Sequence, residues 1–139
     1  MRNSPLSTAD LPGVFPVPPL CRRNDAEQSI DFAQTARVAK HIADGGIRNF
    51  LYGGNAFLYH ITLAEYGDLL DWCESCPDDW TMLPSAGPSF GRAMDQAPMI
   101  ARHSFPAVML LPCADPRDAA GLERGYRRFA DACGTPLIV

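Results

Sequence analysis

The sequence has very little lysine and no concentration of positive charge. Lys40 is the only lysine among 12 Lys and Arg residues, so arginine carries nearly all of the positive charge. The arginines are scattered along the chain, and 16 Asp and Glu residues leave a formal net charge of −4. A nucleic-acid or anionic-membrane partner needs a concentrated basic face, so neither partner is expected.

Long apolar runs and nucleotide-binding glycine motifs are also missing. No run approaches the ~18 apolar residues that span a bilayer, and Met1–Asp10 lacks the apolar core of a secretory signal. Neither G-x-G-x-x-G nor G-x-x-x-x-G-K-[ST] occurs, so no nucleotide cofactor is expected. The five cysteines are an odd number spread along the chain, which is typical of reduced thiols in the cytoplasm.

The composition present is that of one globular domain. A chain of 139 residues has room for a single domain of ordinary size. Its 47% hydrophobic and 20% charged residues exclude wholesale disorder. We expect residues 1–12 to be a loose N-terminal segment and residues 13–139 to form the folded unit.

Short apolar runs recur at intervals of about 30 residues, with segments of helical periodicity between them. Each run is closed by proline, glycine or a polar cluster. The runs are Gly13–Leu20, Ile47–Tyr52, Trp80–Pro84, Ala107–Pro112 and Pro136–Val139. This alternation predicts an α/β fold of the form (βα)4β with parallel strands.

The expected first two helices have clear end signals. The first is predicted from about Ala26 to Asp44, with Asn24 or Asp25 as its cap and a glycine pair after it. The second begins with Thr62-x-x-Glu65, which has the form of a capping box.

The third and fourth helices are predicted from caps and apolar spacing. The third follows Ser89, and Pro98 within it is expected to kink or restart it. The fourth is predicted to have Asp115 as its cap and Pro116 in its first turn, and to end at Gly134. Its apolar stripe consists of Leu122, Tyr126, Phe129 and Cys133.

Several motifs occur in an order that resembles one enzyme family. Gly13–Leu20 is similar to an opening strand G-x-x-P-x-x-T-P-F, and Ile30–Asp31 to the Ile-Asp pair that follows. Gly53–Thr62 aligns without a gap to G-T-T-G-E-F-x-x-L-T. Ala86–Gly87, Leu111–Pro112 and Thr135–Val139 are similar to the later strand ends. The chain thus resembles the N-terminal half of the dihydrodipicolinate synthase / N-acetylneuraminate lyase family, which implies part of a TIM (β/α)8 barrel.

The resemblance implies a lyase or aldolase that acts on a 2-oxo acid such as pyruvate. That chemistry uses a Schiff base to a lysine on the sixth strand, which is expected to lie beyond Val139. Lys40 is expected on the polar face of the first helix and does not replace it. Gly54 and Asn55 stand at the family's paired threonines, and Phe57 at its glutamate. The isolated chain is therefore expected to be inactive.

The glycine-rich turn is the candidate substrate site. A tight turn at the carboxyl end of a barrel strand aims backbone N–H groups at a carboxylate, and glycine permits a close approach. We therefore predict that Gly53, Gly54 and Asn55 bind the 2-oxo acid, with the Tyr59 hydroxyl as a further contact. An ordinary strand-to-helix turn, with Tyr59 in aromatic packing, is the alternative.

Other reactive residues favour structural interpretations. Cys73-x-x-Cys76 has redox or metal spacing, but no second pair completes a metal site, and two helix-end thiols are expected. His41 and His103 are expected on helices away from a site, whereas His60 follows the glycine turn more closely. Asp115 and Arg117 follow the fourth predicted strand, where Asp115 is expected to be an N-cap. No metal or other cofactor is expected.

A function of a different class stays open from the sequence alone. The chain is equally compatible with a non-catalytic pseudo-enzyme, or with a small flavodoxin-like module that binds a metabolite or a partner protein. Half a barrel leaves two sheet edges and an apolar inner face open, so self-association into a homo-oligomer is expected.

Overall fold

The chain forms four strands that alternate with four helices. The computed structural model describes residues 1–54, 57–113 and 118–139. The strands are β1 (Asn49–Tyr52), β2 (Thr81–Ala86), β3 (Val108–Leu110) and β4 (Leu137–Ile138). The helices are α1 (Phe32–Asp44), α2 (Leu63–Glu74), α3 (Phe90–Ile100) and α4 (Ala119–Cys133), with short 3-10 helices η1 (Thr8–Asp10) and η2 (Leu58–His60). The predicted α/β alternation is confirmed.

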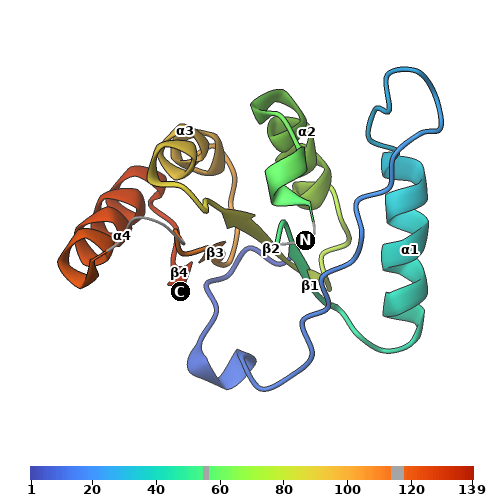
Figure 1. Ribbon diagram of the computed structural model, residues 1–139. Helices are drawn as coiled ribbons and strands as arrows, with labels where there is room; N and C mark the ends of the chain where they lie inside the picture. The colour runs from blue at the N-terminus through green and yellow to red at the C-terminus, as the bar shows by residue number, and fades with distance from the viewer. Residues whose placement is uncertain (55–56, 114–117) are drawn as a thin grey trace.

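The sheet has the sequential order β1-β2-β3-β4, and every pair of neighbouring strands is parallel. The four helices lie along one side of this sheet (Figure 1). Residues 1–20, which we call the N-terminal segment from here on, lie on the other side (Figure 1). This arrangement is that of part of a (β/α)8 barrel. A doubly wound sheet has helices on both faces and a reversal of strand order. The flavodoxin-like alternative is therefore wrong for the part of the chain described.

The first predicted strand, Gly13–Leu20, does not form. Its one ladder-like hydrogen bond to the described part of the sheet is from the Leu51 N–H, which donates to the Pro16 carbonyl at 3.0 Å. Pro16, Pro18 and Pro19 have no N–H to donate, so this segment cannot maintain a regular ladder. The segment runs beside β1 as irregular backbone.

The first helix begins six residues later than predicted from Ala26. Its N-cap is Asp31, whose carboxylate accepts the Gln34 N–H at 2.9 Å, and not Asn24 or Asp25. Residues 21–31 instead form a loop closed by an antiparallel bridge between Arg22 and Ile30. The predicted end of the helix is confirmed, since Gly45 is its C-cap.

The capping box of α2 is confirmed in both directions. The Glu65 N–H donates to the Thr62 hydroxyl at 3.1 Å, and the Thr62 N–H donates to the Glu65 carboxylate at 2.8 Å. Ser89 caps α3 as expected. Pro98 lies inside the last turns of α3, which continues through it as one helix to Ile100.

The fourth helix begins at Ala119, and its N-cap is Asp118. The Asp118 carboxylate accepts the Gly121 N–H at 2.8 Å. The expectation that Asp115 caps this helix is therefore wrong, because Asp118, three positions nearer, offers the same acceptor at the first turn. Asp115 and Pro116 lie outside the described residues. The predicted end is confirmed, since Gly134 adopts a left-handed conformation with φ of 65°.

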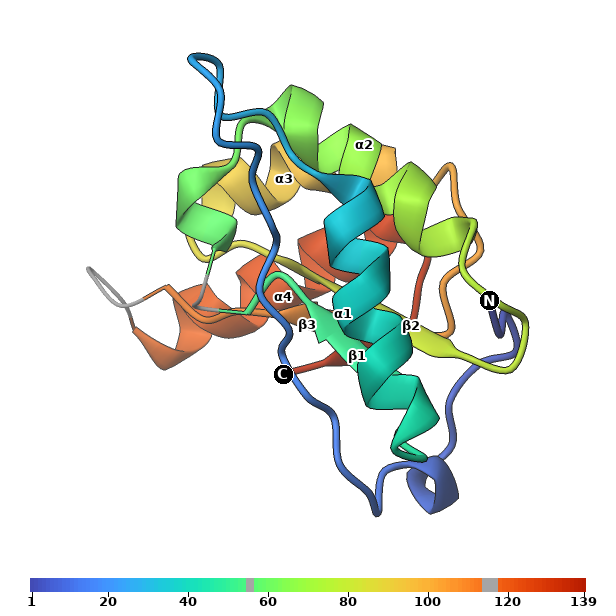
Figure 2. The ribbon, with the colours of Figure 1, turned by 90° about the vertical axis from the view of Figure 1, so that its right-hand side faces the viewer.

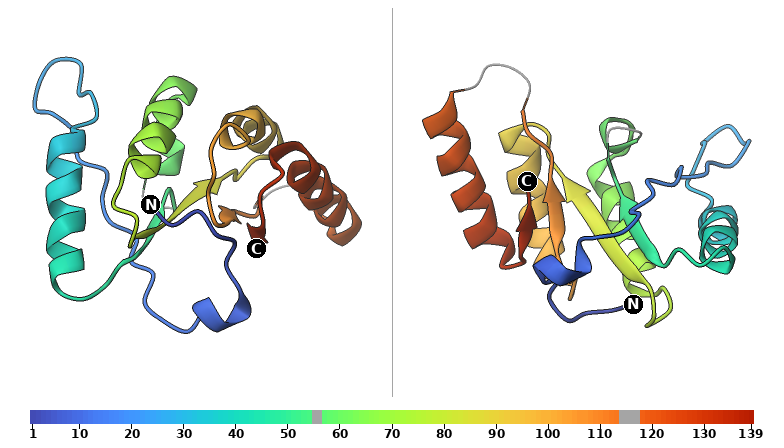
Figure 3. Two further views of the ribbon diagram at one scale, coloured as in Figure 1. Left: turned by 180° about the vertical axis from the view of Figure 1, so that it is seen from behind. Right: turned by 90° about the horizontal axis from the view of Figure 1, so that it is seen from below.

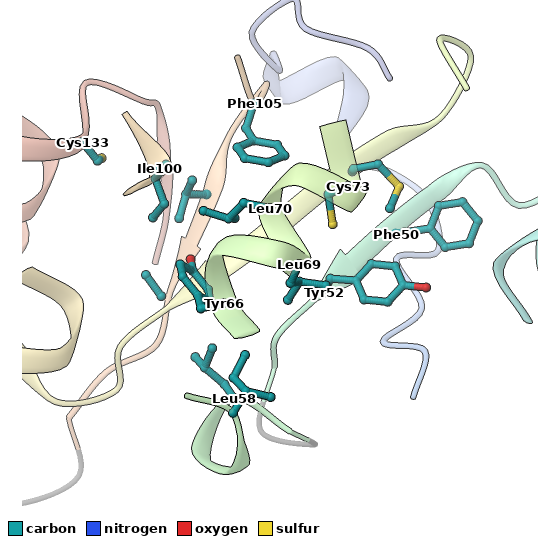
Figure 4. Packing of buried hydrophobic residues seen from close by; sticks show 14 of the residues in the cluster. Phe50, Tyr52, Leu58, Tyr66, Leu69, Leu70, Cys73, Ile100, Phe105 and Cys133 are labelled. Carbon is teal, nitrogen blue, oxygen red and sulfur yellow. The ribbon is translucent and has the colours of Figure 1, made fainter. Parts of the chain in front are cut away.

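Two apolar clusters lie on opposite faces of the sheet. The larger cluster, which includes Met82, fills the space between the strands and the helices. Phe50 and Tyr52 lie on the α2 side of the strands (Figure 4). The smaller consists of Leu51, Leu83 and Ala107. Because successive strand residues point to opposite faces, these three lie on the face that would be the interior of a complete barrel. We call this face the inner face.

The N-terminal segment covers the inner face. Leu6 and Phe15 pack against the smaller cluster. The Arg2 N–H donates to the Trp80 carbonyl at 2.8 Å, and the Leu6 N–H donates to the Pro106 carbonyl at 3.2 Å. Figures 2 and 3 show this segment crossing the sheet opposite the helices. Apolar surface that a complete barrel would bury is thus partly removed from water by the chain itself.

We expect Phe15→Ala to lower the free energy of unfolding by about 1–2 kcal/mol, since the ring is half-buried against the inner face. The matched control is Val14→Ala, because Val14 is 61% exposed and its truncation should change stability by less than ~0.5 kcal/mol. Urea unfolding measures both. Equal effects would show that the segment does not stabilise the sheet.

Candidate functional site

The glycine turn follows β1 at the carboxyl edge of the sheet. Gly53 has a φ of +117°, a conformation that side-chain-bearing residues rarely adopt. A Cβ added there would lie 3.0 Å from the Ser85 Cβ. One added at Gly54 would lie 3.2 Å from a methyl group of Val17. The turn is therefore packed closely between β2 and the N-terminal segment, and only glycine fits its first position.

Ser85 is the polar side chain that faces this turn from the next strand. It follows Leu83 by two residues on β2, so it belongs to the inner face. The residue is fully buried, and within residues 1–54, 57–113 and 118–139 its hydroxyl has no hydrogen-bond partner. A buried hydroxyl without a partner costs roughly 1–3 kcal/mol. Because barrel enzymes bind their ligands at the carboxyl ends of the strands, this hydroxyl is a candidate hydrogen-bonding group for a ligand.

Two side chains from the helix layer hold the end of β2 in place. The Tyr66 hydroxyl, on α2, donates to the Ser85 carbonyl at 2.8 Å, and Figure 4 shows this ring beneath the strand. The Gln96 side-chain oxygen, on α3, accepts the Gly87 N–H at 2.8 Å. Burial raises the pKa of Tyr66, which keeps its hydroxyl protonated as a donor. Both contacts are buried and position the backbone on either side of Ala86.

The backbone after β2 also approaches β3 very closely. Gly87 has a φ of +98°, and a Cβ added to it would lie 2.8 Å from the Leu111 carbonyl oxygen. The Leu111 N–H in turn donates to the Ala86 carbonyl at 2.9 Å. The carboxyl ends of β1, β2 and β3 are therefore held closely together, and Gly53, Ser85 and Gly87 are all buried there.

The structure brings together only part of the predicted substrate site. Gly53 and Gly54 lie at the carboxyl edge, beside Ser85. Asn55 lies outside the described residues. Tyr59 is on η2 with 58% of its surface exposed, and no contact to the glycine turn is seen for its hydroxyl among the described residues. His60 is likewise exposed. The assignment of a substrate to these residues stays a prediction.

The other basic side chains are at a distance from this edge or engaged elsewhere. Lys40 is exposed on α1, and its ammonium donates to both carboxylate oxygens of Asp44 at 2.8 Å. His41 is exposed on the same helix. His103 lies after α3, where its Nδ1 is 2.8 Å from the Glu74 carboxylate. Arg117 lies outside the described residues, as does Asp115.

The sequence motifs did not identify Ser85 or Gln96 as candidate site residues. Ser85 stands in an apolar run and carries no motif, and Gln96 lies in a helix with several other polar residues. One sequence feature pointed to this position: Ser85 is a polar residue at the end of an apolar run, two positions before Gly87. Its burial without a partner depends on the packing of the whole sheet.

The Cys73-x-x-Cys76 pair is structural. Cys73 is completely buried, and burial raises the pKa of its thiol. Burial also raises the pKa of Cys76 to about 11. Both thiols are therefore protonated near neutral pH, whereas metal binding and thiol–disulfide exchange require the thiolate. No group of three metal-ligating side chains occurs among the described residues.

Two cavities lie on the helix side of the sheet rather than on the inner face. One, of about 250 Å³, lies between α3 and α4 and is lined mainly by apolar side chains such as Phe90, Leu110 and Phe129. The other, of about 540 Å³, lies between α1 and α2 beside Trp72 and Trp80. Neither cavity includes the glycine turn or Ser85, although the smaller one reaches the carboxyl ends of β2 and β3 at Pro88 and Leu111.

Comparison with solved structures supports the fold assignment. The chain is similar to N-acetylneuraminate lyase from Fusobacterium nucleatum, with a TM-score of 0.72 and 12% identity over 85% of this chain. It is also similar to YagE from E. coli K12, a prophage protein of the dihydrodipicolinic acid synthase family, with a TM-score of 0.70 and 15% identity over 87% of this chain. The structural resemblance predicted from the motifs is thus confirmed at the level of the fold.

The chain spans about two-fifths of the length of these structures, since it covers 42% of each. That share fits the N-terminal half of a (β/α)8 barrel. No model of a known protein family matches the chain, and no curated protein matches it. In the described residues, no helix has the length and apolar character needed to cross a membrane.

We expect Cys73 and Cys76 to react much more slowly with iodoacetamide at pH 8 than the half-buried Cys21. Labelling of Cys76 should increase as the pH is raised toward 11, because the reactive thiolate then accumulates. Peptide mass spectrometry after timed labelling measures each rate, and urea-unfolded protein provides the control. Rapid labelling of both at pH 8, or protection removed by a zinc chelator, would contradict the structural assignment.

Proposed function

We propose that this chain is part of a lyase-type (β/α)8 barrel that acts on a 2-oxo acid such as pyruvate. The reaction is carbon–carbon or carbon–oxygen bond cleavage, or its reverse, through a Schiff base. The lysine for that Schiff base is supplied from outside these 139 residues, and the isolated chain binds without turnover. The role of this part is to hold the carboxylate end of the substrate.

The observation that carries the proposal is the glycine turn at the carboxyl edge of a sequential parallel sheet. Barrel enzymes form their sites at this edge, and backbone N–H groups of a glycine turn are suitable donors to a carboxylate. The similar structure of YagE was solved in complex with pyruvate, which supports a 2-oxo acid as the ligand class. The odd number of cysteines, spread along the chain, favours a cytoplasmic setting.

The binding part of the proposal is tested by titrating the 139-residue chain with pyruvate and following backbone amide signals by NMR. We expect millimolar binding, because so small a ligand gains few contacts, with the largest shifts at Gly53 and Gly54. Gly54→Ala should weaken binding several-fold, since the added Cβ would lie 3.2 Å from a methyl group of Val17 and would displace the turn. Gly91→Ala is the matched control, because a Cβ there meets nothing within 4 Å.

The same samples test the covalent part after borohydride reduction. A Schiff base requires an amine with a free lone pair, and the Lys40 ammonium is exposed and paired with Asp44. The intact mass of the chain should therefore be unchanged. A stoichiometric pyruvyl adduct on Lys40 would contradict both the expected inactivity and the assignment of the lysine to another part of the barrel.

Self-association is a second part of the proposal. In the described sheet, β4 has one edge without a strand neighbour, and the outer edge of β1 is bordered by irregular backbone around Pro16 rather than by a strand. Edges without a strand neighbour favour pairing with another chain. We propose that two copies associate through these edges. Sedimentation equilibrium should show a dimer that dissociates on dilution, whereas a monomer at every concentration would contradict it.

A non-catalytic pseudo-enzyme is the alternative function. The absence of a hydroxyl in the turn Gly53-Gly54-Asn55 favours it, because neither glycine nor an amide relays protons as a hydroxyl does. It predicts the same pyruvate binding. It differs in expecting no turnover even when the chain is joined to the remaining strands of a barrel.

A further inference from the structure

We propose that the Ser85 hydroxyl donates a hydrogen bond to an oxygen of the bound 2-oxo acid and supplies the hydroxyl that the glycine turn lacks. The inference rests on the proposed function and names a residue that the motifs did not indicate. It starts from one observation, which is that this hydroxyl is fully buried and has no hydrogen-bond partner among the described residues.

The location of Ser85 fits a ligand contact. It is the last inner-face residue of β2, and its Cβ lies 3.0 Å from where a Cβ of Gly53 would be. The side chain therefore borders the glycine turn from the neighbouring strand. A ligand whose carboxylate lies over Gly53 would bring an acceptor oxygen to the one side-chain donor on this stretch of β2. The neighbouring side chains along the strand, at Leu83, Pro84 and Ala86, have no donor.

The position of Ser85 is also fixed before any ligand arrives. Tyr66 holds the Ser85 carbonyl from α2, and Gln96 holds the Gly87 N–H from α3. These two buried contacts satisfy backbone groups on the helix side of the strand and leave the serine hydroxyl for the inner face. A donor held in this way loses little conformational freedom on binding, which is the condition for an effective contact.

The structural alternative is that the Ser85 hydroxyl stabilises the fold. The two interpretations differ in the effect of Ser85→Ala. Removing a buried hydroxyl that has no partner in the free protein leaves stability unchanged or raises it, whereas removing a bonded hydroxyl lowers it. Alanine is smaller than serine, so the variant fits the strand without a clash.

The experiment compares pyruvate affinity and urea stability in wild type, Ser85→Ala and Thr81→Val. Thr81 is the matched control, since it is a buried hydroxyl residue on the same face of β2 at its amino end. We expect Ser85→Ala to weaken pyruvate binding about tenfold, equivalent to about 1.4 kcal/mol, with no loss in the urea midpoint. Thr81→Val should leave the affinity unchanged.

The other possible outcomes distinguish an error in the role of Ser85 from an error in the proposed function. If wild type binds pyruvate and Ser85→Ala binds it equally well, the role of Ser85 is wrong while the proposed function stands. A lower urea midpoint for Ser85→Ala, or an equal loss of affinity in Thr81→Val, would assign the serine a structural role. If wild type binds no pyruvate, the proposed function fails, and the role of Ser85 fails with it.

Discussion

The burial of β2 on both faces is the constraint on which the rest of the structure depends. All six residues of this strand are buried, and it is hydrogen-bonded to β1 on one side and to β3 on the other. A strand without a solvent face needs cover above and below. The helices supply one cover through Tyr66, Leu69 and Leu70. The N-terminal segment supplies part of the other through Leu6 and Phe15.

This constraint also explains the candidate site. Because β2 is enclosed, the polar groups at its carboxyl end must be satisfied inside the protein. Tyr66 and Gln96 satisfy the backbone there, whereas the Ser85 hydroxyl has no partner among the described residues. The Tyr52 hydroxyl and the side-chain nitrogen of Gln96 are likewise buried without a partner among the described residues, but both belong to the helix side, and Ser85 is the one of the three that faces the inner face.

Much of the fold was predictable because its signals are local. The Thr62–Glu65 capping box, the glycine that ends α4, and the recurrence of apolar runs each depend on residues within a few positions of one another. Errors arose where neighbours in space decided the outcome. Gly13–Leu20 has strand-like composition, yet its prolines lack the donors that a ladder next to β1 requires.

The sequence by itself determined the alternating α/β pattern, the capping box of α2, the glycines that end α1 and α4, and the placement of a glycine turn after the second apolar run, since periodicity and capping are short-range properties. Only the tertiary structure decided that Ser85 faces this turn, that Tyr66 and Gln96 hold the strand beside it, and that Phe15 covers the inner face. These contacts join residues from separate elements. Their existence depends on strand register and on helix packing, which no single stretch of the chain specifies.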